Sequence, residues 1–494
     1  NRKKKMEKLG EEGRRLLTLS NASNLREALE SLTTTSRTFE GRSELASLGI
    51  VPATLDLIRS LPPEDTDAGL LLSLRLLRNL CAGESTNQDA FVTRNGVRIV
   101  SEIIARERED DGGGIVRAGL QVLGNVSLGG ERHRRAVWEG LFPSGFVAVS
   151  RVRRKECCDP LCMVVYSCVD GVPGLVHQLC GDSGLPLLGN IVRTLSLVGF
   201  EEDWAKLLIS RVCLEEDHFP GLFSSLYSCS PSSGVGDRVD LTRDEFSPEQ
   251  SYLLGIVSDI LNQRIMEILI SEDFALCVLG IFRRSVVVID SVCGGKSSLP
   301  TGITTIDVLG YSLAILRDIC AQDVKANFKE EDRVDAVDAL LASGLVELLL
   351  SLLRDLEPPS TIRKTMRQSE NKEASGSSCP KVCPYKGFRR DIVGIIGNCA
   401  YRRKKVQDEI REKNGILLLL QQCVVDEDNP FLREWGLWSM RNLLEENQEN
   451  QQAVAELELQ ETVDVPELAR LNLKVEIDQL TRRAKLVNVP ASGT

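Results

Sequence analysis

The 494-residue sequence predicts an all-α protein, a solenoid of stacked helical repeats, and the first observation behind this prediction is a recurrent spacing. Asn398 stands nine residues before Gln407, which stands seven residues before the pair Asn414-Gly415. The same landmarks recur at Asn79, Gln88 and Asn95-Gly96, and the nine-residue step alone recurs at Asn442 and Gln451. The step between landmark asparagines is 44 residues from 398 to 442 and 46 residues from 79 to 125. Armadillo and HEAT repeats are about 40–47 residues long, so the sequence predicts repeats of this kind.

The second observation is the helical periodicity of the apolar residues between these landmarks. They recur at intervals of three and four, as in Leu70, Leu74 and Leu77, which is the stripe that an amphipathic helix buries. Asn414-Gly415 is typical of a left-handed stop between two helices. The residues 428–430, Asp-Asn-Pro, are typical of a helix start, with a polar cap and a proline in the first turn. Stacked units of one short and two longer helices bury a continuous core, which predicts an armadillo-like right-handed α-solenoid.

Length and composition are those of a folded chain without a general nucleic-acid surface. The chain exceeds the roughly 250–300 residues at which a single core stops growing, which agrees with a repeat array. Its net charge of −11 argues against a broad basic face, so we expect no nucleic-acid partner. No apolar run reaches about 18 residues, so no membrane span is expected. The N-terminal residues lack the apolar segment of a signal peptide, and the missing initiator methionine suggests a fragment or a trimmed chain.

The cysteines indicate the redox compartment. There are fifteen, an odd number, and most lie within apolar helical runs, as Cys81, Cys320 and Cys399 do. This distribution is typical of reduced thiols in a protein core. Because such thiols persist in reducing compartments, the sequence predicts a cytoplasmic location.

Three motifs suggest catalytic or ligand chemistry, and each lacks a part that its chemistry needs. Residues 181–184 read Gly-Asp-Ser-Gly, as around a serine-protease nucleophile, but Leu-Pro follows them and the region has helical periodicity. A loose cluster lacks the second pair of ligands that structural zinc favours; it comprises Cys157, Cys158, Cys162, Cys168, His177 and Cys180. Residues 294–297, Gly-Gly-Lys-Ser, resemble the end of a phosphate loop. The first glycine of that motif would stand at position 290, where the sequence has Asp290. We therefore predict no catalytic residue, no metal and no cofactor.

Two segments of the C-terminal part carry a family resemblance. They read CPYKGFRRDIVGIIGNCAYRRKKVQDEI (383–410) and NPFLREWGLWSMRNLLEENQENQ (429–451). Both resemble the C-terminal domain of the ataxin-10 family. The resemblance implies an all-helical, cytoplasmic, non-catalytic binding protein that is linked to cytokinesis and cell survival and that associates with itself.

The expected domain order follows from these landmarks and from changes in composition. Residues 231–250 and 357–381 are polar and poor in large apolar side chains, which predicts a loop insertion and a flexible segment. In the less regular repeats, Thr194 and Asp318 stand in the landmark position. The predicted order is an N-terminal helical cap (1–42), degenerate armadillo-like repeats (43–356) with a loop insertion (231–250), a flexible linker (357–384), C-terminal ataxin-10-like armadillo repeats (385–484) and a tail (485–494).

The landmark asparagines are the first candidates for binding a partner. In armadillo proteins of the importin-α and β-catenin type, which this pattern resembles, the third helix of each repeat lines the concave face and its asparagine binds the backbone of an extended peptide. The candidates are Asn79, Asn125, Asn398 and Asn442. An amide suits this role because it offers one acceptor and two donors. Buried amides are also commonly bonded within the fold, so the same residues are candidates for caps or bridges between neighbouring helices.

One tryptophan extends the candidate surface. Trp438 stands four residues before Asn442, on the same helical face, as in the importin-α pattern. The equivalent positions of the other repeats hold Arg75, Gln121 and Gly394. The leading hypothesis is therefore a non-catalytic protein–protein interaction scaffold. The alternative is a nuclear-transport-type armadillo adaptor that binds extended peptides, which would need the repeated tryptophan.

A row of arginines completes the set of candidates. Arg78, Arg193, Arg317 and Arg441 each directly precede the landmark position. Consecutive residues of a helix point about 100° apart, so these side chains would flank the asparagines. Guanidinium groups bind carboxylates through two hydrogen bonds, which suggests an acidic protein segment as the partner. The alternative is that each arginine pairs with an acid of the adjacent repeat.

Overall fold

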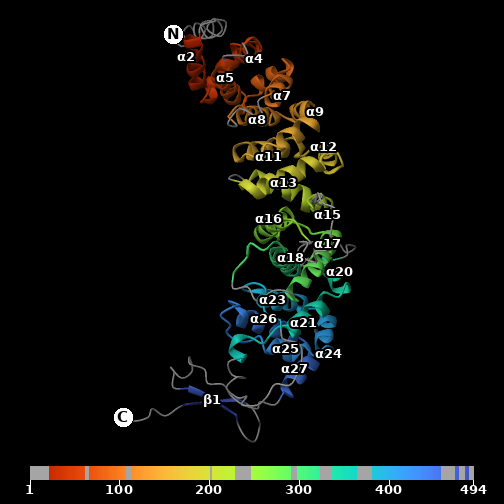
Figure 1. Cartoon of the computed structure of the whole chain (residues 1–494). Helices are drawn as coiled ribbons and strands as arrows, with labels where there is room; N and C mark the ends of the chain where they lie inside the picture. Colours follow the sequence, from red (N-terminus) through yellow and green to blue (C-terminus); the bar gives the residue numbers. More distant parts are fainter. Residues whose placement is uncertain are drawn as a thin grey trace, which may run out of the picture. The chain divides into compact units, whose positions relative to one another are not determined.

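The predicted all-α fold is confirmed by the computed structural model. It describes residues 22–61, 66–106, 114–200, 203–227, 246–290, 297–322, 335–363, 381–457, 473–477 and 484–488. Apart from one short strand pair, the named elements are helices, and Figure 1 shows them following one another along the chain. Their contacts divide the chain into two compact units, unit 1 (Asn1–Val286 and Gly302–Ile315) and unit 2 (Val287–Thr301 and Leu316–Thr494).

Unit 1 contains helical repeats of the predicted kind. Its helices are α2 (Ala22–Thr35), α3 (Phe39–Ser47), α4 (Ile50–Ser60), α5 (Thr66–Leu80), α6 (Ser85–Thr93), α7 (Gly96–Arg106), α8 (Gly114–Ser127), α9 (Glu131–Leu141), α10 (Ser144–Ser150), α11 (Lys155–Val169), α12 (Pro173–Cys180), α13 (Leu185–Val198), α14 (Trp204–Ser210), the π-helix Arg211–Glu215, α15 (Phe219–Ser225), α16 (Pro248–Arg264) and α17 (Glu272–Ser285). The third helices α2, α5, α8 and α11 pack on one another in that order. They bury a continuous apolar face, as stacked repeats require.

Unit 2 contains the regular C-terminal repeats. Its elements are α20 (Ala336–Ala342), α21 (Leu345–Asp355), α23 (Phe388–Ala400), α24 (Lys404–Glu412), α25 (Gly415–Leu420), α26 (Leu432–Leu444), α27 (Gln448–Ala455), β1 (Leu473–Ile477) and β2 (Ala484–Asn488). The division between the units falls within α18 (Thr304–Cys320) and just after the 3-10 helix Val286–Asp290 has begun. The third helices α23 and α26 pack closely along their length, and their facing residues are buried.

The left-handed stops lie where the Asn-Gly pairs predict them. Asn95 and Asn414 have φ angles of 58° and 55°, and each directly precedes a helix, α7 or α25. Gly49 and Gly344 hold the same position before α4 and α21, with φ angles of 66° and 78°. Glycine and asparagine tolerate this backbone region better than other residues do, so the two residue types are interchangeable at this turn.

The predicted helix start at 428–430 is wrong by two residues. Helix α26 begins at Leu432, after Phe431 in the left-handed region at φ 65°. Asn429 is buried and caps another helix, because its Oδ1 accepts the backbone N–H of Arg389 at 3.0 Å. Its Nδ2 donates to Asp426 at 3.1 Å. The asparagine therefore joins this loop to the first turn of α23 and does not begin α26.

The expected insertion and linker are described only at their ends. Residues up to 245 of the 231–250 insertion lie outside the described residues, and its last residues begin α16, where Ser247 and Gln250 form a reciprocal capping box. Residues 364–380 of the 357–384 linker also lie outside them. At the ends of the linker, the Glu357 N–H donates to the Lys381 carbonyl at 2.9 Å. Helix α21 packs on α23 and α25, so the helices before and after the linker belong to one compact unit.

The strand pair near the C-terminus was not predicted. Strands β1 and β2 are antiparallel, with Leu473 opposite Asn488 and Ile477 opposite Ala484. Helical repeats were expected as far as 484 and a tail after it, whereas the last described helix is α27. Residues 473–477, Leu-Lys-Val-Glu-Ile, alternate apolar and polar side chains, and this alternation was the available signal for β1.

No single helix among the described residues is long and apolar enough to cross a membrane. Helices α20 and α21 pass the length and composition test only as a pair, and they are bent by 61° at the break between them. The apolar residues of this pair, such as Leu340 and Leu349, are fully buried in the protein.

Candidate partner-binding groove

Side-chain amides join each regular third helix to the third helix of the preceding repeat. In each case an asparagine Nδ2 donates to a backbone carbonyl. The pairs are Asn79 with Thr33 (3.5 Å), Asn125 with Arg78 (2.8 Å), Asn398 with Arg317 (3.4 Å) and Asn442 with Gly397 (3.0 Å). In the last three pairs the acceptor directly precedes the landmark position of the preceding repeat. These contacts are the bridges between neighbouring helices that were the alternative expectation for the landmark asparagines. Partner binding by the same amides stays a prediction.

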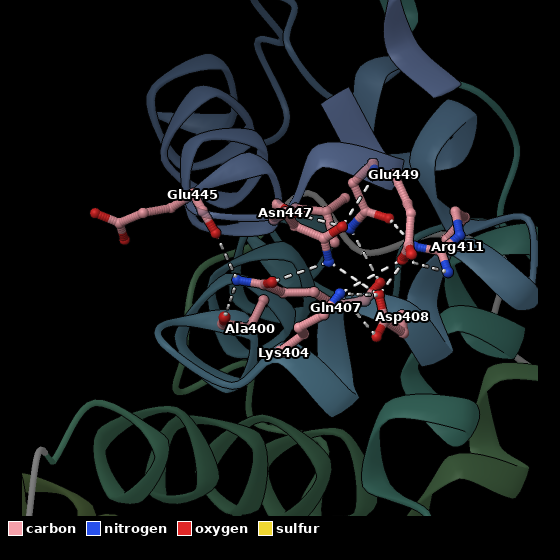
Figure 2. Close-up of polar contacts among 10 residues, drawn as sticks. Ala400, Lys404, Gln407, Asp408, Arg411, Glu445, Asn447 and Glu449 are labelled. Carbon is pink, nitrogen blue, oxygen red and sulfur yellow. Dashed lines mark hydrogen bonds and ion pairs between the residues drawn. The ribbon is translucent and has the colours of Figure 1, made fainter. Parts of the chain in front are cut away.

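The glutamines nine residues after the landmark account for the regular spacing. Gln407 donates from Nε2 to the carbonyl of Ala400, seven residues earlier, at 3.3 Å (Figure 2). It also donates to the carbonyl of Asn442 in the next repeat at 2.8 Å. Gln88 makes the equivalent two bonds at 3.0 and 2.9 Å. Arg134 holds the same position in another repeat and donates to a carbonyl at the end of α11. In these three repeats the position holds a long donor that reaches a carbonyl at a helix end of the next repeat.

A polar cluster surrounds Gln407 (Figure 2). Asn447, the cap of α27, donates to Gln407 Oε1 at 3.1 Å and to Asp408 Oδ1 at 2.9 Å. Arg411 and Lys404 donate to the same carboxylate at 2.9 and 3.4 Å. The hydrogen bond from Asn447, together with those from Arg411 and Lys404, lowers the pKa of Asp408 below its ordinary value.

This lowered pKa predicts a loss of stability in acid. A carboxyl group whose pKa is lower in the folded state stabilises the fold above its unfolded pKa of about 3.9, and that contribution is lost as the pH falls through the folded value. Urea midpoints measured from neutral pH to below about pH 4 should therefore fall less steeply for Asp408→Asn than for the unchanged chain. If the urea midpoints of the two proteins fall in parallel with pH, Asp408 does not contribute to the loss of stability in acid.

A groove in unit 2 brings four of the predicted residues together. It has a volume of about 490 Å³ and lies between the end of α18, α23 with the residues that follow it, and α26. Asn398, Trp438, Arg441 and Asn442 line it. Asn442 is buried, whereas Trp438 and Arg441 are open to solvent.

Trp438 and Arg441 form the exposed wall of this groove. The indole is 47% exposed, and the Arg441 guanidinium carbon lies 4.9 Å above the centre of its ring. The nearest acid to Arg441 is Glu445 at 3.9 Å, at the limit of an ion pair. Residues three apart on a helix share a face, which places the two side chains together. The pair offers an aromatic surface and a guanidinium that no close acid neutralises.

Trp435 has a different environment. It is partly buried over Gly394 of α23, where an added Cβ would lie 3.3 Å from the indole. Gly394 holds the position that a tryptophan would take in the importin-α pattern. Because Gly394 has no side chain, α26 can approach α23 closely there. Of Trp435 and Trp438, only Trp438 faces the groove.

The groove also contains two residues that the sequence analysis missed. Tyr401 and Arg402 follow α23 directly, and the Arg402 guanidinium carbon lies 4.9 Å above the tyrosine ring. Arg402 has a φ angle of 53°, in the left-handed region that non-glycine residues seldom adopt. Arg403 also lines the groove but pairs with Asp335 at 3.4 Å. The run Tyr-Arg-Arg-Lys-Lys after a landmark helix was the available signal.

The other predicted arginines are engaged within their own units. Arg317 donates to Asp318 and to the buried Asp391 of α23, at 3.0 and 3.1 Å. Burial disfavours its charge, but the two carboxylates outweigh it and raise the pKa of Arg317. Arg193 donates to the carbonyl of Ser225 at 3.0 Å. Arg317 therefore pairs with an acid of the adjacent repeat, as the alternative expected. Arg193 instead binds a backbone carbonyl.

Arg78 is held by neutral groups. Its Nε and Nη2 donate to Asn79 Oδ1 at 3.2 and 3.1 Å, and its Nη1 donates to Gln121 Oε1 at 3.1 Å. Gln121 belongs to α8, so this contact also joins two repeats. No carboxylate is among these partners.

The motifs that suggested chemistry lie in ordinary structural positions. Residues 181–184 form the turn between α12 and α13. The cysteines of the predicted cluster are buried thiols of α11 and α12, and burial raises the pKa of Cys168 to about 12. Across the described parts of the chain, no three His, Cys, Asp or Glu side chains converge as metal ligands would. The phosphate-loop motif at 294–297 lies mostly outside the described residues.

Most of the residues that line the groove lie within a recognised family domain. The model of the spinocerebellar ataxia type 10 protein domain matches residues 388–486. Ataxin-10 of Xenopus tropicalis is 24% identical over 410 residues, which cover 81% of this chain and 77% of that protein. The ataxin-10 homolog of Dictyostelium discoideum is 38% identical over 105 residues, which cover 21% of this chain and 17% of that protein. The chain is similar to ataxin-10 over most of its length and carries the domain of that family at residues 388–486. The resemblance noted at residues 383–410 and 429–451 is thereby confirmed, and the match extends well upstream of them.

Similarity to solved structures adds nothing to this similarity to ataxin-10. A crystal structure of an engineered protein aligns over 87% of both chains, with 14% sequence identity and a TM-score of 0.34. A score this low supports no inference. The fold assignment rests on the stacked helices and their hydrogen bonds.

Proposed function

We propose that this ataxin-10 family protein is a non-catalytic scaffold of the cytoplasm that holds an extended segment of a protein partner in the groove at Trp438. The observation that carries the proposal is the exposed Trp438–Arg441 stack beside a groove of about 490 Å³. Exposed tryptophan and arginine are the residue types most enriched at the energetic centres of protein interfaces. A role in cytokinesis and cell survival, and self-association, belong to the same proposal and rest on the family resemblance.

The chemistry of the groove favours an acidic partner segment. Arg402 and Arg441 have no close ion pair among the described residues, and their guanidinium groups stack on aromatic rings. A stacked guanidinium keeps its N–H edges free for carboxylates. Asn398 lies on the same groove and offers an amide to a peptide backbone. The net charge of −11 disfavours a polynucleotide, and the proposal includes no membrane contact.

The test combines stability with binding to a defined peptide. Trp438→Ala should change the free energy of unfolding by less than about 1 kcal/mol, because the indole is half exposed. The same change should weaken binding of a synthetic peptide of alternating glutamate and serine at least about tenfold, as should Arg441→Glu. Binding is measured by fluorescence anisotropy of the labelled peptide at two salt concentrations.

Leu437→Ala is the matched control for this experiment. Leu437 precedes Trp438 on α26 and is 56% exposed, but it does not line the groove. Its removal should leave both stability and peptide affinity unchanged. Equal effects of Leu437→Ala and Trp438→Ala on affinity would overturn the assignment of the groove.

The nuclear-transport-type alternative is disfavoured by the charge of the groove. Such an adaptor binds peptides rich in lysine and arginine, which three arginines in the groove would repel. The positions that would need a tryptophan hold Arg75, Gln121 and Gly394. A lysine-rich peptide should therefore bind more weakly than the acidic one, and the opposite order would favour the adaptor.

A further inference from the structure

A second hollow, in unit 1, concentrates positive charge. It has a volume of about 720 Å³ and lies between α2, α5 and α8, which follow one another in the N-terminal part of the chain (Figure 1). Its lining includes Arg37, Arg75, Arg78 and Arg117. Three of these side chains, at 37, 75 and 117, are exposed. Four guanidinium groups, two from α5, one from α8 and one from the turn after α2, thus surround a single opening.

The lining does not neutralise this charge. Its one acid is Glu30, which pairs with Arg26 at 3.0 Å, and Arg26 does not line the hollow. Arg78 is held by the amides of Asn79 and Gln121, which carry no charge. Burial, and then the charges of Arg75 and Arg117, lower the pKa of Arg78. Among the described residues, Glu30 is therefore the one carboxylate in a lining that holds four arginines, and it already pairs with Arg26.

We propose that this hollow binds the phosphate group of a phosphorylated serine or threonine in a partner protein. A phosphoryl group carries about −1.5 to −2 charges at neutral pH and three strong acceptor oxygens. A carboxylate carries one charge and two oxygens, which would leave most of the four guanidinium groups uncompensated. Clusters of arginine are a known mode of phosphopeptide recognition. The phosphate would stand between the guanidinium forks, with Arg78 already oriented by two amides.

Two further features favour a protein segment over other phosphates. The residues that line the hollow come from α2, α5 and α8 and the turn after α2, so an extended partner segment would cross three successive repeats on either side of the phosphate. A polynucleotide would place many phosphates against a chain of net charge −11, whereas a single phosphate needs only the four arginines of this hollow. The site lies in unit 1 and shares no residue with the Trp438 groove, so it goes beyond the function proposed above.

The experiment uses the full chain and a labelled synthetic peptide of glycine, serine and alanine that carries one phosphoserine. Anisotropy should show binding at least about tenfold tighter than that of the same peptide with serine or glutamate at that position. Arg75→Glu and Arg117→Glu should each weaken phosphopeptide binding at least about tenfold, with the melting temperature unchanged because both side chains are exposed. Added salt should weaken the binding of the unchanged chain.

The matched control is Arg98→Glu, an equal charge change on α7 of the same unit. Arg98 is 79% exposed and does not line the hollow, so the affinity should stay within about twofold. Trp438→Ala should leave phosphopeptide binding unchanged, and Arg75→Glu should leave the acidic peptide at the Trp438 groove unchanged. These two variants separate a failure of this proposal from a failure of the proposed function.

Four results would overturn the proposal. Equal binding of the glutamate and phosphoserine peptides would show a site for carboxylates. Tighter binding of a single-stranded RNA than of the phosphopeptide would show a nucleic-acid site. An equal loss with Arg98→Glu would show a general charge effect. The acids of residues 107–111 precede α8 and lie outside the described residues. If the phosphopeptide binds only after these acids are changed to amides, the occupant of the hollow is this chain's own carboxylates.

Discussion

Gln407→Leu is expected to lower the free energy of unfolding by about 3 kcal/mol, because one buried amide serves three carbonyl groups. Gln407 is 2% exposed, and its Nε2 donates to the carbonyls of Ala400, Asn442 and Glu445 at 3.3, 2.8 and 3.3 Å (Figure 2). Its Oε1 accepts from Asn447. Leucine has a similar volume but offers these carbonyls no donor at a buried interface between two repeats. Urea unfolding followed by circular dichroism measures the loss.

Gln451→Leu is the matched control. Gln451 holds the same position in the next repeat and donates to the carbonyl of Leu444 at 2.8 Å, but that bond is exposed to water. Because water replaces the lost partner, the change should cost less than about 1 kcal/mol. If the two leucine variants are equally stable, the amide of Gln407 does not hold the repeats together.

Gly436→Ala is the second change with a large expected effect, a destabilisation of about 2–3 kcal/mol. A Cβ at this position of α26 would lie 2.8 Å from the carbonyl oxygen of Gln422 and 3.0 Å from the backbone nitrogen of Cys423. Both contacts are with backbone, which cannot turn away as a side chain can. To accommodate the added Cβ, helix α26 must move away from the segment that follows α25. Trp438 lies on the same helix, so its position also changes. We therefore expect weaker binding of the acidic peptide as well as a lower urea midpoint.

Gly280→Ala provides the control for helix propensity. Gly280 lies within α17, and an added Cβ there meets no atom within 4 Å. Alanine favours the helix over glycine by roughly 0.5–1 kcal/mol, so this variant should be slightly more stable than the unchanged chain. If Gly436→Ala were also stabilising, the close approach of α26 to residues 422 and 423 would be incorrect.

The regular spacing was readable from the sequence because its causes are local. A glutamine reaches the carbonyl seven residues earlier across one tight turn, as Gln407 reaches Ala400. The asparagine of the Asn-Gly pair adopts the left-handed backbone that separates two helices, as Asn414 does. Both relations connect residues close in the chain, so they give fixed intervals in the sequence.

The candidate site was only partly predictable because exposure depends on the neighbouring repeat. Trp435 and Trp438 are three residues apart on one helix, yet Trp435 is partly buried over Gly394 while Trp438 faces the groove. Arg317 and Arg441 both precede a landmark position. Arg317 finds a buried carboxylate on α23, whereas Arg441 stacks on an indole. The spacing of residues in the sequence does not tell which tryptophan or which arginine becomes buried or paired.

The sequence by itself determined the helical repeats, their length and most of their turns, since apolar periodicity and left-handed stops act within a few residues. Tertiary structure decided which polar groups hold the repeats together and which remain available. Asn429 caps α23 across 40 residues of chain, so α26 begins at Leu432 and not at the proline. The four arginines of unit 1 meet at one hollow only because α2, α5 and α8 stack. Such contacts join residues far apart in the chain, and their geometry exists only after the repeats have packed.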